Sequence, residues 1–470
     1  MTDLDRSSDV AARAEPRSVG GLRSLVRNSA GIMGTSVINS ALGYGYWTLA
    51  ARIMPAGAVG LGSALVSSMV IVSLLTHLGA GAGLISRLPH RAKPREWRLT
   101  VVAVLVAHVA ATVVLAAGAV YIIGEFVPSL RLLIDSPTLA AWFVVGAAAW
   151  TSADLLDYVF IAERRASLMT LRNAATALTK VSTLAIIAFA ASRPGATWLV
   201  VTWAVSAIVG TLAGLAACHY RVGKLGRVPL RSIGRELVLT ARPALGHHFI
   251  SVCGLLPTYL LPVVVTARLG PQQNAYFYVT WMVGSAIFMI SPAVSSALFA
   301  EASHDRHRLR QLVSRSFVIT IALLVAAATV LIAGGHLILR IFGSGYGSGF
   351  PLLVLLVVSA FPDAVSNIAV AVLRVHGQLA RAGWLSAVIA FVVIPGAWLA
   401  TPHWGILGPG IAWVAAQVCG ALVVLLVART PETARSRRAG ITHPGPPSDV
   451  STHRGADAVV VPSTIPGAND

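Results

Sequence analysis

The feature that most constrains this chain is a series of twelve long apolar stretches. Each has about 20 or more mostly uncharged residues, enough at about 1.5 Å per residue to cross a hydrocarbon core of about 30 Å. We therefore predict an all-α integral membrane protein. The predicted spans are Asn28–Ala51, Val59–Ile85, Leu99–Ile123, Thr138–Ala162, Thr170–Ala191, Thr197–Ala217, Ala244–Ala267, Asn274–Leu298, Leu312–Ala333, Phe350–Leu373, Leu379–Ala400 and Trp404–Ala428.

The loops between these stretches alternate between Arg-rich and nearly Arg-free. Of the 36 Lys and Arg residues, about 30 fall in the tails and loops of one side, and Lys180 lies within a span. Cytoplasmic loops of membrane proteins collect Lys and Arg. The alternation therefore predicts a multi-pass protein of the inner (cytoplasmic) membrane with both termini in the cytoplasm.

The net charge of +18 alone would suggest a nucleic-acid partner. Here the cations lie at span ends, next to anionic inner-leaflet lipid, where each contributes about 1 kcal/mol. No basic stripe interleaved with aromatic residues occurs in a soluble segment. We expect membrane lipids, and no nucleic acid, as partners.

The two halves of the chain carry a related motif. Ala51-Arg52-Ile53-Met54-Pro55 ends the first predicted span, and Ala267-Arg268-Leu269-Gly270-Pro271 ends the seventh. Parallel repeats of this kind are typical of transporters with a substrate path between the halves. The predicted organisation is a disordered cytoplasmic tail (1–27), a six-helix lobe (28–217), a cytoplasmic basic linker (218–243), a second six-helix lobe (244–428) and a disordered cytoplasmic tail (429–470).

Several stretches resemble a known family. They are LLTHLGAGAGLISRL at Leu74–Leu88, DYVFIAERRASLMTLRN at Asp157–Asn173, and the shorter Ala275–Tyr278 and Ile341–Gly343. Over about Leu25 to Arg429, the chain resembles the polysaccharide (O-antigen/exopolysaccharide) flippases of the multidrug/oligosaccharidyl-lipid/polysaccharide exporter superfamily. The resemblance implies two six-helix lobes that work by alternating access. It also implies translocation of a polyprenyl-pyrophosphate-linked oligosaccharide for lipopolysaccharide or exopolysaccharide synthesis, with a polysaccharide polymerase and glycosyltransferases as partners.

Other functions remain open at this stage. A cation-coupled small-molecule or drug exporter of the same superfamily commonly has a carboxylate in the first span, and Asn28–Ala51 has none. Lipid II flippases often carry two further helices, which this chain lacks. A membrane scaffold without transport is a third alternative. The outer loops are short and no GxxxxGK[ST] loop is present, so we expect no enzyme activity, cofactor or metal.

Ionisable residues inside spans are the first candidates for a site, since each costs about 2.5–3.5 kcal/mol at a helix centre unless paired or hydrated. Asp154 and Lys180 lie at similar distances from one inner turn and are expected to meet, either as a structural ion pair or as part of a substrate cavity. His77 and His108 flank another inner loop in the same way. They are expected to form a packing pair or to couple transport to protons.

Further candidates lie in the second half and at the outer ends. Asp363 is expected in the cavity, with no evident partner. Arg52 and Arg268 are related by the repeat and are expected to bind pyrophosphate, or to anchor helix ends by snorkelling. Pro257 and Pro262 interrupt the seventh span and are the expected hinge.

The predicted topology can be tested with single cysteines in a background without the three native ones. Cysteines at Ser129 and Ser348 should react with an impermeant thiol reagent in intact cells, because the basic-residue distribution places both outside. A cysteine at Ser232 should stay unlabelled until the cells are broken. Labelling of position 232 alone in intact cells would reverse the orientation.

Overall fold

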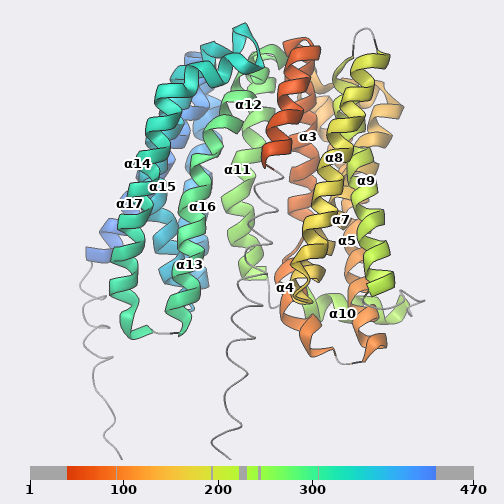
Figure 1. Cartoon of the computed structure of the whole chain (residues 1–470), viewed down its shortest axis with the longest axis vertical. Coiled ribbons are helices and arrows are strands. Elements are labelled where there is room, and N and C mark those ends of the chain that lie inside the picture. The colour runs from red at the N-terminus through yellow and green to blue at the C-terminus, as the bar shows by residue number, and fades with distance from the viewer. Residues whose placement is uncertain are drawn as a thin grey trace, which may run out of the picture. The chain divides into compact units, whose positions relative to one another are not determined.

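The computed structural model describes residues 40–91, 93–191, 194–221, 230–241, 245–304 and 306–429. Every regular element in these ranges is a helix, which confirms the all-α prediction. Both predicted disordered tails lie outside the described residues, apart from Arg429 at the end of the last helix. Beyond an initial helix over residues 40–53, the α-helices are α3 (Ala56–Thr76), α4 (Ala80–Arg87), α5 (Pro94–Phe126), α6 (Leu132–Asp135), α7 (Pro137–Ala162), α8 (Ala166–Ala190), α9 (Ala196–Arg221), α10 (Leu230–Ala241), α11 (Leu245–Leu269), α12 (Pro271–Ser285), α13 (Ile290–His304), α14 (Leu309–Phe342), α15 (Phe350–Val375), α16 (Leu379–Trp404) and α17 (Leu407–Arg429) (Figure 1).

These helices account for the predicted spans. Within the described residues, 10 helices are long and apolar enough to cross a membrane, and the number is 11 if α12 and α13, bent by 40°, are counted as one span. Of the first predicted span, the structure describes the helix over residues 40–53. The fold is therefore that of an integral membrane protein.

The helix surfaces suit a hydrocarbon environment. Large apolar side chains are widely exposed on several spans, among them Val114 on α5, Phe189 on α8 and Phe391 on α16. Patches of this extent would promote aggregation in water, but they match lipid tails. Hydroxyl groups inside the spans instead bond back to their own helix, as Thr112 Oγ1 does to the His108 carbonyl oxygen at 2.7 Å.

The related motifs form equivalent turns in the two halves. In the first half, Pro55 precedes α3, which begins at Ala56. In the second, α11 ends at Leu269, Gly270 adopts a φ of 86°, and Pro271 opens α12. We call the end of the bundle that carries these turns the outer end, because the basic-residue distribution predicts that it faces outside.

The two halves meet at the outer end through α3 and α12. The approach is so close that a Cβ added at Gly60 would lie 1.7 Å from the Pro271 carbonyl oxygen. The Asn274 side chain, fully buried, donates Nδ2–H to the Gly60 carbonyl oxygen at 2.7 Å and to Ser63 Oγ at 3.1 Å. Only glycine allows two helix backbones this near each other.

Further contacts close the outer end. Trp47 and Tyr278 lie edge to face with ring centroids 4.7 Å apart. Tyr44 Oη donates to the Met282 carbonyl oxygen at 2.9 Å. Both contacts join the initial helix to α12, so the first helix of one half packs on the second helix of the other. Together with the Gly60 contact they hold the halves together at the outer end.

The linker between the halves contains an amphipathic helix, α10, which lies across the lower end of the bundle in Figure 1. Its buried Glu236 accepts a hydrogen bond from Thr100 Oγ1 at 2.7 Å and pairs with Arg87 at 3.3 Å and with Arg91. Burial alone would raise the pKa of Glu236, but the Thr100 hydrogen bond and the two arginine charges outweigh it, and the pKa is lowered. This cluster ties α10 to the first half of the chain.

Replacement of Gly60 by alanine should destabilise the protein, because the new methyl group forces α3 and α12 apart. We expect a loss of about 1–3 kcal/mol in the free energy of unfolding, measured in detergent micelles. Gly57→Ala on the same helix is the matched control, since a Cβ there meets nothing within 4 Å. Equal stability of the two variants would contradict the close contact.

Candidate functional site

The second predicted span, Val59–Ile85, is broken towards its inner end. Helix α3 ends at Thr76 and α4 begins at Ala80. Between them Leu78 has a φ of 42° and Gly79 a φ of 77°. A left-handed leucine costs about 1–3 kcal/mol and persists where surrounding contacts hold it in place. Irregular backbone at membrane depth is tolerated where it is buried in protein or lines a cavity, so this break marks a candidate site.

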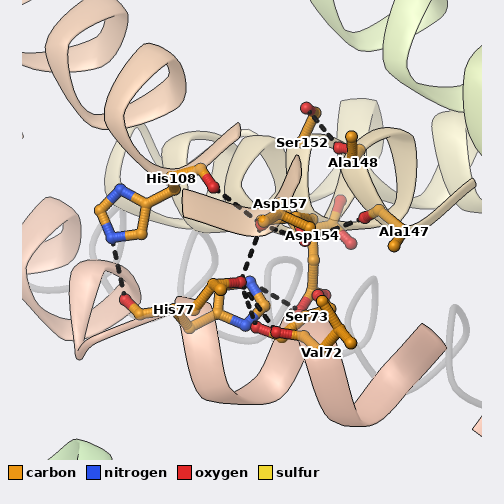
Figure 2. Close-up of polar contacts among 12 residues, drawn as sticks. Val72, Ser73, His77, His108, Ala147, Ala148, Ser152, Asp154 and Asp157 are labelled. Carbon is orange, nitrogen blue, oxygen red and sulfur yellow. Dashed lines mark hydrogen bonds and ion pairs between the residues drawn. The ribbon is translucent and has the colours of Figure 1, made fainter. Parts of the chain in front are cut away.

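Two histidines and an aspartate surround the break (Figure 2). His77 Nε2 lies 3.3 Å from Asp154 Oδ2 on α7, which is ion-pair distance. His108 on α5 is buried, with Nδ1 2.6 Å from the Val104 carbonyl oxygen and Nε2 3.1 Å from the His77 carbonyl oxygen. Carbonyl oxygens only accept, so both contacts are hydrogen bonds only when the ring carries two protons.

Asp154 is more exposed than the two histidines. The Asp154 side chain is 44% exposed, whereas that of His77 is 13% exposed. His108 packs inside, near a buried hydrogen-bonded row formed by Thr76, Thr112 and Thr151. Asp154 therefore presents a carboxylate at the surface of the first half, and the histidines connect it to the broken backbone. His108 contacts the backbone of His77 rather than its ring, and both the packing role and the proton coupling of this pair stay predictions.

The structure gives Asp154 and Lys180 different partners, so the expected contact between them was wrong. The turn that joins α7 to α8 lies at residues 163–165, and Arg172 therefore belongs to α8. Asp154 is then about 12 Å from that turn and Lys180 about 21 Å. The two charges lie at different depths.

The ion pair between α7 and α8 is formed by Arg172 and Asp157. It is buried and forms a two-pronged pair with Asp157 on α7: Nε to Oδ1 at 2.9 Å and Nη2 to Oδ2 at 2.5 Å. Asn173 adds a third hydrogen bond to the same carboxylate at 2.9 Å. The charge of Arg172 is thus neutralised inside the first half. We had counted this residue as a loop cation because hydropathy alone does not separate a buried arginine from a loop one.

Lys180 is held by aromatic rings. Its Nζ lies 4.1 Å from the ring centroid of Trp203 on α9 and 5.4 Å from that of Tyr46 on the initial helix. Tyr46 Oη is hydrogen-bonded to Thr202 Oγ1 at 2.6 Å, which fixes the ring. Within the described residues, no carboxylate lies within 4.0 Å of Lys180. Cation–π contacts hold an ammonium group without neutralising it.

The remaining candidates lie apart from this group. Asp363 on α15 is half-buried and accepts from Asn367 Nδ2 at 2.9 Å; no cation pairs with it among the described residues. Arg52 donates Nε–H to the Ile341 carbonyl oxygen at 2.7 Å, and Arg268 stacks on Trp398 at 4.6 Å. Both arginines are exposed at the outer end, in surroundings that differ despite the repeat.

The predicted hinge lies in a continuous helix here. Pro257 and Pro262 are both buried within α11, which runs without interruption from Leu245 to Leu269. The 40° bend occurs in the next span, between α12 and α13. Bending at the two prolines stays a prediction. Over the described ranges, no group of three or more His, Cys, Asp or Glu side chains could hold a metal ion.

Comparison with known proteins identifies the fold. No family model matches the sequence, and no curated protein matches it. Among solved structures, an inward-facing multidrug-resistance MATE transporter of the MOP superfamily gives a TM-score of 0.69 at 14% identity, covering 86% of this chain and 99% of that one. The chain has a MOP-transporter fold.

Two other structures with the MOP fold are similar to the chain. The lipid II flippase MurJ in an inward closed conformation gives a TM-score of 0.67 at 12% identity, over 85% of this chain and 87% of that one. A MOP superfamily transporter from Pyrococcus furiosus gives 0.63 at 16% identity, over 88% and 96%.

The Asp157–Arg172 pair should be structural. Asp157→Asn leaves the buried guanidinium without a carboxylate, and we expect the free energy of unfolding to fall by about 3–5 kcal/mol in detergent. Asp135→Asn is the control: Asp135 pairs with Arg131 at 3.9 Å and both side chains are 62% exposed, so its loss should be at most about 1 kcal/mol. Similar losses in the two variants would remove the special role of the buried pair.

Proposed function

We propose that this chain is a flippase that moves polyprenyl-pyrophosphate-linked oligosaccharide across the cytoplasmic membrane by alternating access. Two observations support this proposal. The chain has the MOP fold, which is found in transporters and in a lipid II flippase, and its motifs resemble those of polysaccharide flippases. The product would serve cell-surface polysaccharide synthesis, with the glycosyltransferases acting before it and the polymerase after it.

The observation that carries this proposal is the charge on Lys180. A pyrophosphate crossing the membrane needs a cation that no carboxylate has already neutralised. Arg172 is paired with Asp157, whereas Lys180 is held by the rings of Trp203 and Tyr46. Tyr46 is fully buried and Trp203 is partly exposed, so Lys180 lies at the edge of a packed aromatic cluster. A cation without a carboxylate partner suits a substrate that carries a pyrophosphate.

The contacts at the outer end indicate the direction from which substrate enters. The Gly60, Asn274 and Trp47 contacts hold the halves together at that end. Two of the similar structures are described as inward-facing or inward closed. We infer that the present arrangement receives the lipid-linked sugar from the cytoplasmic side and that separation of α3 from α12 releases it outside.

A second candidate is export of a small molecule by cation antiport. The His77–Asp154 contact at a broken helix favours it, since a carboxylate and a histidine inside a span can exchange a proton. Lipid II is a third candidate, because it shares the polyprenyl pyrophosphate and differs in its sugar. Arg52 and Arg268 remain proposed pyrophosphate ligands near the outer mouth.

Lys180→Gln should reduce flipping at least tenfold in proteoliposomes that contain a polyprenyl-pyrophosphate-linked oligosaccharide, because it removes the cation and leaves a polar side chain one atom shorter. Lys180→Arg should retain part of the rate. Arg131→Gln, in an exposed outer loop, is the control and should flip at the parental rate. Parental flipping by Lys180→Gln would overturn the assignment, and proton-driven drug export without sugar-lipid flipping would favour the second candidate.

A further inference from the structure

An apolar groove of about 700 Å³ runs between α3, α5 and α11. Its walls include Val72 and Leu75 of α3, Val114 and Gly118 of α5, and Leu260 and Val263 of α11. The first two helices belong to the first half of the chain and the third to the second half. The groove therefore lies where the two halves meet.

The groove offers no polar group to an occupant. Ser68 is its one polar lining residue among those described, and its hydroxyl donates to the Ala64 carbonyl oxygen at 2.9 Å. At its mouth Val114 is 74% exposed and Ile122 56% exposed. All three helices are spans, so the surrounding medium is hydrocarbon. Because the groove is apolar and lies among membrane spans, we expect its occupant to be a hydrocarbon chain.

The shape of the groove favours a thick, branched chain over a straight one. Its α5 side alternates pairs of small residues (Ala110 and Ala111, Gly118 and Ala119) with pairs of branched residues (Val114 and Leu115, Ile122 and Ile123). A Cβ added at Gly118 would meet no atom within 4 Å. From Ala110 to Ile123 the helix rises about 20 Å. A polyprenyl chain carries a methyl branch on every isoprene unit and needs this extra width.

One end of the groove lies at the depth of the broken helix. Leu75 lies two residues before His77, and Ala110 lies two residues after His108. An amphiphile with its chain in the groove would therefore have its head at one end of the groove, at the depth of the broken helix.

We propose that this groove holds the polyprenyl chain of the transported lipid while the charged head occupies the polar region between the halves. The inference rests on the proposed function and adds where the chain goes. Because α11 supplies one wall, the chain would lie against both halves and would stay in contact with the membrane throughout. Chain recognition would then be a property of α5 and α11, separate from recognition of the sugar.

The test fills the groove from its open side. Gly118→Phe and the smaller Gly118→Leu add volume at a lining residue whose Cβ would meet no atom within 4 Å. Gly334→Phe on α14 is the matched control, since a Cβ there meets only Ile338, at 3.7 Å. The full-length protein is purified in detergent with equimolar undecaprenyl phosphate and dioleoylphosphatidylglycerol. Native mass spectrometry then counts each lipid retained, and thermal unfolding confirms that the variants are folded.

The parent and Gly334→Phe should retain undecaprenyl phosphate in preference to the phospholipid. Gly118→Phe should retain at least fivefold less, with Gly118→Leu between. Equal retention by folded Gly118→Phe and the parent, or replacement of the polyprenyl lipid by phosphatidylglycerol in the parent, would overturn the proposal.

A flipping assay separates this outcome from the fate of the proposed function. If the parent flips sugar-linked lipid and Gly118→Phe both flips and retains it normally, the groove assignment fails and the function stands. If the parent retains polyprenyl phosphate in a Gly118-dependent way but flips no sugar-linked lipid, the groove stands and the sugar assignment fails.

Discussion

The close approach of α3 and α12 organises the rest of the molecule. With no side chain at Gly60, the Pro271 carbonyl oxygen occupies space that any larger residue would need, and Asn274 bonds to the Gly60 carbonyl oxygen. In lipid, apolar surfaces gain little by meeting each other, so helix association depends on backbone proximity and buried hydrogen bonds. This contact supplies both, and the aromatic contacts of the initial helix lie around it.

The charges inside the first half fall into two kinds. Arg172 and Asp157 neutralise each other in a buried, fully hydrogen-bonded pair, which suits a structural role. Lys180, by contrast, lies against aromatic rings, and Asp154 is half-buried beside a histidine. Charges that are costly to bury and yet left available are expected where a substrate or an ion supplies the missing partner. Neutralised and unneutralised charges can be told apart only when the contacts of each side chain are known.

Hydropathy and length were enough to predict the class and the spans, since both depend on summed transfer energies along the chain. The glycine-rich stretch after Thr76 was noticed, but hydropathy does not reveal that Leu78 would adopt a left-handed conformation. The expected contact between Asp154 and Lys180 was wrong because α8 begins at Ala166, which places Lys180 farther from the turn than Asp154. Side-chain partners depend on helix register and rotation, and neither can be read from a buried, mostly apolar pattern.

The attachment of α10 also limits how the halves can move. Glu236 and its arginines fix this helix to the first half, and only three residues separate Ala241 from Leu245, where the second half begins. Four extended peptide units span at most about 14 Å. The start of α11 therefore stays within this distance of the end of α10. The inner ends of the two halves can rotate about this connection but cannot move far apart beside it. A wide opening between the inner ends would therefore have to form on the side of the bundle away from this short connection.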